Sequence, residues 1–124
     1  MRSLITALLA LLVSSCAVVP QKAGSYAAAD ALWEKSKTRT EYRKYRSEFR
    51  ASQNSQRLDD DSGCYAKGRG QSVLLILLVD AKGVIAEAYA DSAVPKAECF
   101  IAAYLGARMP RPPFSPFPVK QQMN

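Results

Sequence analysis

The stretch Val73-Leu74-Leu75-Ile76-Leu77-Leu78-Val79, followed by Asp80-Ala81-Lys82-Gly83, decides the fold of this chain. Seven consecutive apolar residues are too few to cross a membrane, and such a run is typical of a strand that is buried on both faces. The Asp-Ala-Lys-Gly segment predicts a turn, with glycine where a positive φ is favoured. Val84 to Ala90 then forms the partner strand, in which Glu87 indicates one partly exposed face.

Helices are predicted before this hairpin. Tyr26 to Ser36 is alanine-rich and forms a first helical segment. Thr38 and Glu41 are a candidate capping box for a second helix that runs to about Ser52, because a threonine oxygen and a glutamate can each satisfy a free backbone donor. Three aromatic residues recur at i, i+3 and i+7, which predicts that they share one face and pack on the sheet: Tyr42, Tyr45 and Phe49.

A third helix and a last strand are predicted after the hairpin. Pro95 can start the helix at a position that needs no backbone donor. The small residues between Ala97 and Ala107 would let this helix approach the sheet closely: Cys99, Ala102, Ala103 and Gly106. The prolines at 110, 112 and 113 stop it, and Phe117 to Met123 forms a short edge strand. The predicted fold is α+β, a three-stranded antiparallel sheet packed on helices.

The N-terminus has the pattern of an export signal. Arg2 supplies a positive charge, and Leu4 to Val13 is apolar apart from Thr6. Val13-Ser14-Ser15-Cys16 resembles the lipobox of bacterial lipoproteins, in which the cysteine is acylated and becomes the mature N-terminus. The alternative is an ordinary secretory signal with a chance cysteine.

These features divide the chain into three predicted parts. Residues 1–15 are a signal peptide, residues 16–25 are the lipidated Cys16 with a short tether, and residues 26–124 are the folded domain. The remaining cysteines, Cys64 and Cys99, form an even pair, which in an oxidising compartment predicts a disulfide. A closed loop of about 35 residues would stabilise the fold by roughly 3–4 kcal/mol. Two buried free thiols are the alternative.

The charge distribution is uneven. The formal net charge is +6, and basic residues concentrate between Glu34 and Arg57. Export argues against nucleic acid as a partner and leaves anionic lipid headgroups, lipopolysaccharide or acidic protein surfaces. A solvated helix face is the simplest alternative. The candidate basic patch lies on the second predicted helix: Arg43, Lys44, Arg46 and Arg50.

The residue content argues against catalysis and against a cofactor or metal site. The chain has no histidine, the usual general base and metal ligand. The acidic run Asp59–Asp61 with Gly63 does not fit a calcium loop, because Leu58 stands where the first ligand belongs. It is therefore predicted to be a solvated surface. The glycines around Arg69 do not fit a phosphate-binding loop, because a strand follows them.

The order of motifs resembles the C-terminal periplasmic domain shared by the TonB and TolA energy transducers, over about residues 38–124. The resemblance lies in five stretches: Gly70-Gln71-Ser72, the Val79–Val84 turn, Ser92, Cys99–Tyr104 and Pro110-Arg111-Pro112-Pro113. The cysteine-bearing helix before the proline cluster is closer to TolA. Unlike those transducers, the chain has no histidine for motor coupling, no transmembrane helix and no long linker.

The resemblance implies a receptor-facing, protein-binding module in the periplasm, on a lipid anchor and without a motor of its own. In that family an open sheet edge receives an extended peptide, so an outer-membrane receptor or a Tol-system component is the expected partner. Ala17 after the cysteine favours the outer membrane. The expected partner-binding residues lie in the last strand: Phe117, Val119, Lys120, Gln121 and Gln122. The alternative function is an envelope-structural lipoprotein that binds lipopolysaccharide or anionic lipid through its basic helix.

Overall fold

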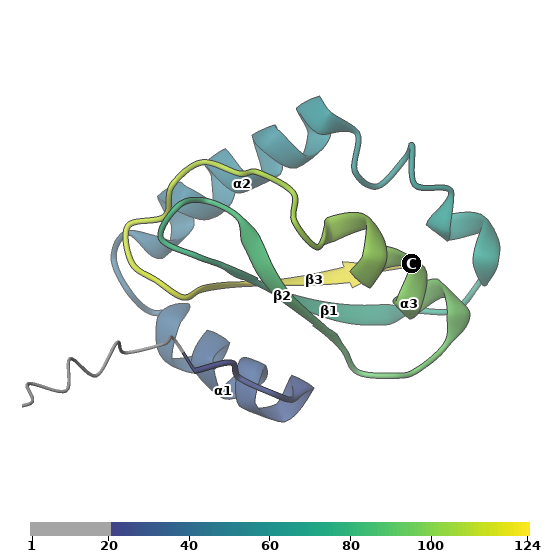
Figure 1. Cartoon of the computed structure of the whole chain (residues 1–124), viewed down its shortest axis with the longest axis horizontal. Helices are drawn as coiled ribbons and strands as arrows, with labels where there is room; N and C mark the ends of the chain where they lie inside the picture. Colours follow the sequence, from purple (N-terminus) through teal and green to yellow (C-terminus); the bar gives the residue numbers. More distant parts are fainter. Residues whose placement is uncertain (1–20) are drawn as a thin grey trace, which may run out of the picture.

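The computed structural model describes residues 21–124, in which a three-stranded antiparallel sheet lies between helices (Figure 1). The predicted α+β class is confirmed. The predicted signal peptide and Cys16 lie outside the described residues. The elements in chain order are α1 (Tyr26–Ser36), α2 (Tyr42–Gln56), the 3₁₀-helix η1 (Cys64–Lys67), β1 (Val73–Val79), β2 (Ile85–Ala90), α3 (Pro95–Tyr104) and β3 (Phe117–Met123).

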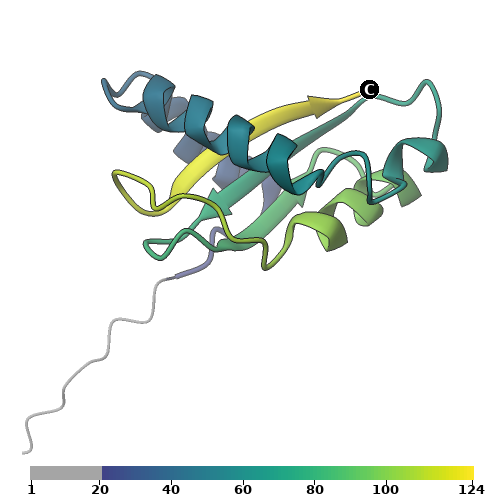
Figure 2. The same ribbon diagram turned by 90° about the horizontal axis from the view of Figure 1, so that it is seen from above.

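The central strand β1 is buried on both faces, as its unbroken apolar sequence predicts. The strand order is β2-β1-β3, and both pairings are antiparallel. Alternate residues of β1, such as Leu75 and Leu77, join the core formed with α2 and α3, whereas Ile76 and Leu78 join a smaller cluster under α1. Figure 2 shows α2 and α1 on opposite sides of the sheet.

Helix α2 packs on the sheet through its aromatic residues, which confirms the prediction from their spacing. Tyr42, Tyr45 and Phe49 are buried, and the ring of Tyr42 stacks on Phe117 with 4.9 Å between centroids. The predicted capping box is wrong. Glu41 precedes the helix with an α-like backbone and makes no capping bond, and its carboxylate pairs with Arg39 instead.

Helix α3 starts at Pro95 as predicted, but its small residues do not form the face that meets the sheet. Ala97, Phe100 and Tyr104 are buried there, whereas Ala102 is exposed. An aromatic ring buries far more apolar surface than an alanine, so the rings decide which face turns inward.

The predicted disulfide is confirmed. Cys64 in η1 and Cys99 in α3 are joined, with 5.5 Å between their Cα atoms, so the bond ties the segment before β1 to the helix after β2. The buried Lys96 strengthens the same junction, because its Nζ donates to the carbonyl oxygens of Gly68 and Gln71 at 3.3 and 2.6 Å. Within residues 21–124, no helix has the length and apolar composition needed to span a membrane.

A candidate peptide-binding cleft beside the last strand

The side chains of β3 alternate between the two faces of the sheet, which narrows the predicted partner surface. Phe117 and Val119 are 0% and 1% exposed and belong to the core under α2 and α3. The amide of Gln121 lies on the same side and exchanges hydrogen bonds of 2.9 and 3.0 Å with Gln53. Lys120 and Gln122 point to the opposite face. A partner can therefore meet β3 through its backbone edge and these two side chains.

Part of the free backbone edge of β3 is already occupied. The Tyr42 hydroxyl donates to the Pro118 carbonyl at 2.9 Å, and the Arg46 guanidinium donates to the Lys120 carbonyl at 3.4 Å. Both carbonyls must therefore face away from β1, and backbone directions alternate along an antiparallel strand. By this alternation the N–H of Lys120 and both backbone groups of Gln122 also face outward. The first half of the edge is closed, and the second half is accessible.

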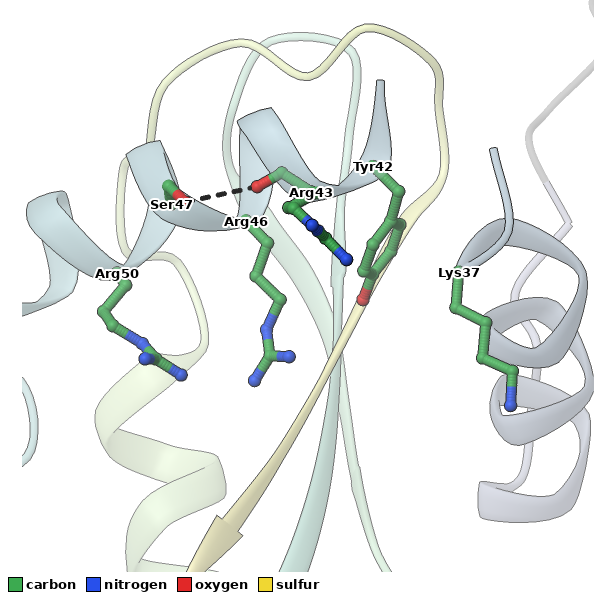
Figure 3. Close-up of a pocket in the computed structure, with 6 residues that line it drawn as sticks. All are labelled: Lys37, Tyr42, Arg43, Arg46, Ser47 and Arg50. Atoms are coloured by element: carbon green, nitrogen blue, oxygen red, sulfur yellow. Dashed lines mark hydrogen bonds between the residues drawn. The ribbon is translucent and has the colours of Figure 1, made fainter. Parts of the chain in front are cut away.

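A cleft of about 280 Å³ lies beside this edge. Figure 3 shows Arg43, Arg46 and Arg50 extending from the same side of α2, with Lys37 at the end of α1 across from them. Tyr42 and Ser47 complete its lining. These arginines follow the i, i+3, i+7 spacing of one helix face. Lys44, the remaining residue of the predicted basic patch, lies in a separate cavity together with Glu41 and Glu48.

The positive charges of the three arginines in the cleft are not balanced by the protein itself. Among residues 21–124, the ion pairs use other basic residues: Lys37 with Glu34, Arg39 with Glu41, Arg57 with Asp61 and Lys120 with Asp30. No carboxylate of this described part pairs with Arg43, Arg46 or Arg50. Like charges this close favour the arrival of an anion.

Trp33 of α1 contacts Tyr42 and Lys37 of the cleft lining. Its indole N–H donates to the Tyr42 oxygen at 3.1 Å, and the ammonium groups of Lys37 and Lys120 lie 4.4 and 4.5 Å from its ring centroid. Burial raises the pKa of Tyr42 above its ordinary value of 10.0, so at neutral pH its hydroxyl keeps the proton that it donates to Pro118. The hydrogen bond with Asp30 raises the pKa of Lys120.

The opposite edge of the sheet, on β2, has a different environment. Its first residue is covered, because the Ile85 N–H donates to Ala107 at 3.0 Å and the Ile85 carbonyl accepts from Gly106 at 2.9 Å. Asp91 donates its N–H to Leu74 of β1, so by alternation the backbones of Ala88 and Ala90 face outward. Within residues 21–124 these two alanines have no further backbone partner outside the sheet.

A buried polar network behind β3 was not predicted from the sequence. The side chain of Asp59 accepts hydrogen bonds from the Tyr104 hydroxyl and from Gln53, which in turn contacts Gln121. The prediction of a solvated surface is therefore wrong for Asp59, which is half-buried. Burial raises its pKa above the ordinary value. Within the described residues, no cluster of three or more His, Cys, Asp or Glu side chains could hold a metal ion.

The described end of the predicted tether is fixed to the sheet. The backbone N–H of Ala23 donates to Glu87 at 2.8 Å, and that of Gly24 donates to the Tyr89 hydroxyl at 2.9 Å. The folded unit therefore includes residues before Tyr26.

Comparisons of the chain with protein-family models, with curated proteins and with solved structures gave no match.

Proposed function

We propose that the chain is a protein-binding module of the bacterial cell envelope, anchored to a membrane by lipid on Cys16, whose sheet receives an extended segment of a partner protein. The observation that carries this proposal is the outer half of the β3 edge, where the outward N–H and carbonyl of Gln122 follow the Lys120 carbonyl that Arg46 of the cleft contacts. Adding a strand there would satisfy these groups through backbone hydrogen bonds. The proposal assigns no catalytic step.

Two further observations support this proposal. The disulfide between Cys64 and Cys99 fits an oxidising compartment such as the periplasm. The element order agrees with the resemblance to the receptor-facing domains of TonB and TolA, which makes an outer-membrane receptor or a Tol-system component the expected partner. The chain would act as an adaptor without coupling to a motor.

A second candidate function is binding to lipopolysaccharide or anionic lipid. The observation that favours it is the row of three arginines without carboxylate partners among the described residues. Such binding would fall steeply with salt.

The test is photocrosslinking in living cells with the probe at Ser47, which lines the cleft and leaves the arginines in place. Gln122→Pro removes an outward-facing N–H from β3, and Ala88→Pro does the same on β2 as the matched control; proline is tolerated at such edge positions. We expect a discrete protein adduct that persists in Ala88→Pro and falls at least about tenfold in Gln122→Pro, since the binding strand loses a backbone hydrogen bond and meets a blocked edge.

The other outcomes are also informative. Loss of the adduct in Ala88→Pro alone would contradict the β3 assignment and move the binding site to the β2 edge. Adducts to lipid or lipopolysaccharide, with none to protein, would support the second candidate function.

A further inference from the structure

We infer that the segment received at the β3 edge is acidic, with carboxylate side chains at alternate positions that face α2. This inference depends on the proposed function and adds the chemistry of the partner. Its basis is the position of Arg43, Arg46 and Arg50, which line the cleft beside the edge that the segment would join.

A strand added at the β3 edge would lie beside α2. A strand paired with β3 lies about 4.8 Å beyond it in the plane of the sheet. The cleft there is bounded by α2 and by Lys37 at the end of α1. Because successive side chains of a strand point to opposite faces, every second residue of the segment faces α2 and its arginines. The intervening residues face α1.

The arginines of the cleft are spaced along α2 over a length comparable to a few residues of an extended segment. From Arg43 to Arg50 the helix rises about 10.5 Å, at 1.5 Å per residue. Residues i and i+2 of an extended segment are about 6.7 Å apart. The arginine row crosses the direction of β3 obliquely (Figure 3), and it is longer than this spacing, so two such carboxylates can lie beside it. Arginine also binds carboxylates through two parallel hydrogen bonds, which favours a defined register.

Arg46 already contacts β3. Its guanidinium is 3.4 Å from the Lys120 carbonyl, a long contact that a partner backbone N–H can replace. The released guanidinium would then be free to bind a carboxylate of the same segment. Strand pairing and charge recognition would therefore occur together, through one side chain.

A peptide fits this arrangement better than a membrane surface. Binding to a bilayer needs a broad cationic face, but Lys44 on α2 lies with Glu41 and Glu48 rather than with the three arginines. The arginines are gathered in a cleft beside a strand, where an extended chain can enter.

The experiment uses the full chain in detergent and a displayed library of random decapeptides. The selected peptides are synthesised, and their dissociation constants are measured by fluorescence anisotropy. We expect Asp or Glu at alternate positions, and an affinity that falls at least tenfold when these are replaced by Asn or Gln. Arg43→Gln with Arg50→Gln should cause a similar loss. The control pair, Lys44→Gln with Lys82→Gln, makes the same change in net charge at exposed positions outside the cleft.

The two proposals can fail separately. Selected peptides without acidic residues, or equal losses in both variant pairs, would overturn the acidic-segment inference and leave strand addition standing. Acidic peptides that keep their affinity after N-methylation of alternate backbone nitrogens would overturn strand addition, because the methyl groups block backbone pairing. If no peptide is selected, both proposals fail. Phosphatidylglycerol vesicles that then bind in an Arg43- and Arg50-dependent manner would identify a membrane surface instead.

Discussion

The two edges of the sheet are protected in different ways. At β3, side chains from α2 cap the outward carbonyls: Tyr42 bonds Pro118, and Arg46 bonds Lys120. At β2, the connection after α3 pairs with Ile85, and past a register shift the backbones of Ala88 and Ala90 face outward. The β3 edge is thus covered by groups that can move away, whereas the β2 edge is covered by backbone for one residue and then left open.

This difference matters because an exposed strand edge can pair with any other strand. A side-chain cover that can be displaced allows one edge to bind a chosen segment, and nearby charges can select that segment. The register shift near Ile85 limits pairing at the start of β2 without offering selection. The β3 edge therefore has the displaceable cover and the nearby charges that the proposed binding site needs, whereas the β2 edge is left open beyond Ile85.

The largest expected effect tests whether binding at the β3 edge is independent of the disulfide between η1 and α3. The disulfide joins η1 to α3 and does not touch the β3 edge. Replacing both Cys64 and Cys99 with alanine should lower the free energy of unfolding by about 3–4 kcal/mol, because the unfolded chain regains freedom. Urea denaturation measures this loss. The variant should still bind a selected peptide under conditions in which it remains folded. If the folded variant does not bind the peptide, the disulfide region and the β3 edge are coupled.

An intermediate effect is expected from the hydroxyl that caps the β3 edge. Tyr42→Phe leaves the Pro118 carbonyl and the Trp33 indole without their partner, which should cost about 1–2 kcal/mol of stability. Tyr89→Phe is the matched change near β2, where the hydroxyl accepts an exposed bond from Gly24 and donates to Glu87, whose carboxylate keeps the Ala23 N–H as a donor. This change should cost less stability. Chemical denaturation of both variants decides this point. Equal losses would mean that the two edges are held equally firmly.

The smallest effect concerns the network behind β3. Burial raises the pKa of Asp59 above its ordinary value of 3.8, so the folded protein binds this proton more tightly than the unfolded chain does. The resulting contribution to stability is complete below pH 3.8 and is lost as the pH rises through the raised pKa. Asp59→Asn should remove this pH dependence. The free energy of unfolding of both proteins is measured from acid to neutral pH. Parallel curves for the wild type and Asp59→Asn would contradict the assignment of this pH dependence to Asp59.

Much of the fold could be predicted because its signals are local in the sequence. The unbroken apolar run of β1 indicated burial on both faces, and the spacing of Tyr42, Tyr45 and Phe49 indicated the inner face of α2. The even pair of cysteines indicated the disulfide. Each of these inferences needs only the pattern within one element or a count of one residue type. The start of α2 could not be placed correctly, because Glu41 has an alternative partner in Arg39.

The candidate site was predicted in part. The expected partner-binding residues lie on β3, but the prediction treated them as one surface. The period of two in a strand already puts Phe117 and Val119 on the face opposite to Lys120. Helical spacing likewise separates Lys44 from the other basic residues of α2, a signal that the sequence interpretation did not use. The contacts of Asp59 with Tyr104 and Gln53 join distant parts of the chain, so no local pattern could reveal them.

The docking of Ala23 and Gly24 on Glu87 and Tyr89 would limit the orientation of the domain on a membrane if the proposed lipid anchor is present. If Cys16 carries lipid, the chain from that anchor to Gln21 spans at most about 18 Å when fully extended. Gln21 lies with the β1–β2 turn and Pro116 around one cavity, so this end of the sheet stays near the bilayer. Since β3 starts directly after Pro116, the accessible backbone at Gln122 lies at the far end of the strand. Strand β3 would therefore run away from the membrane, with the accessible backbone of Gln122 at the end farther from the lipid.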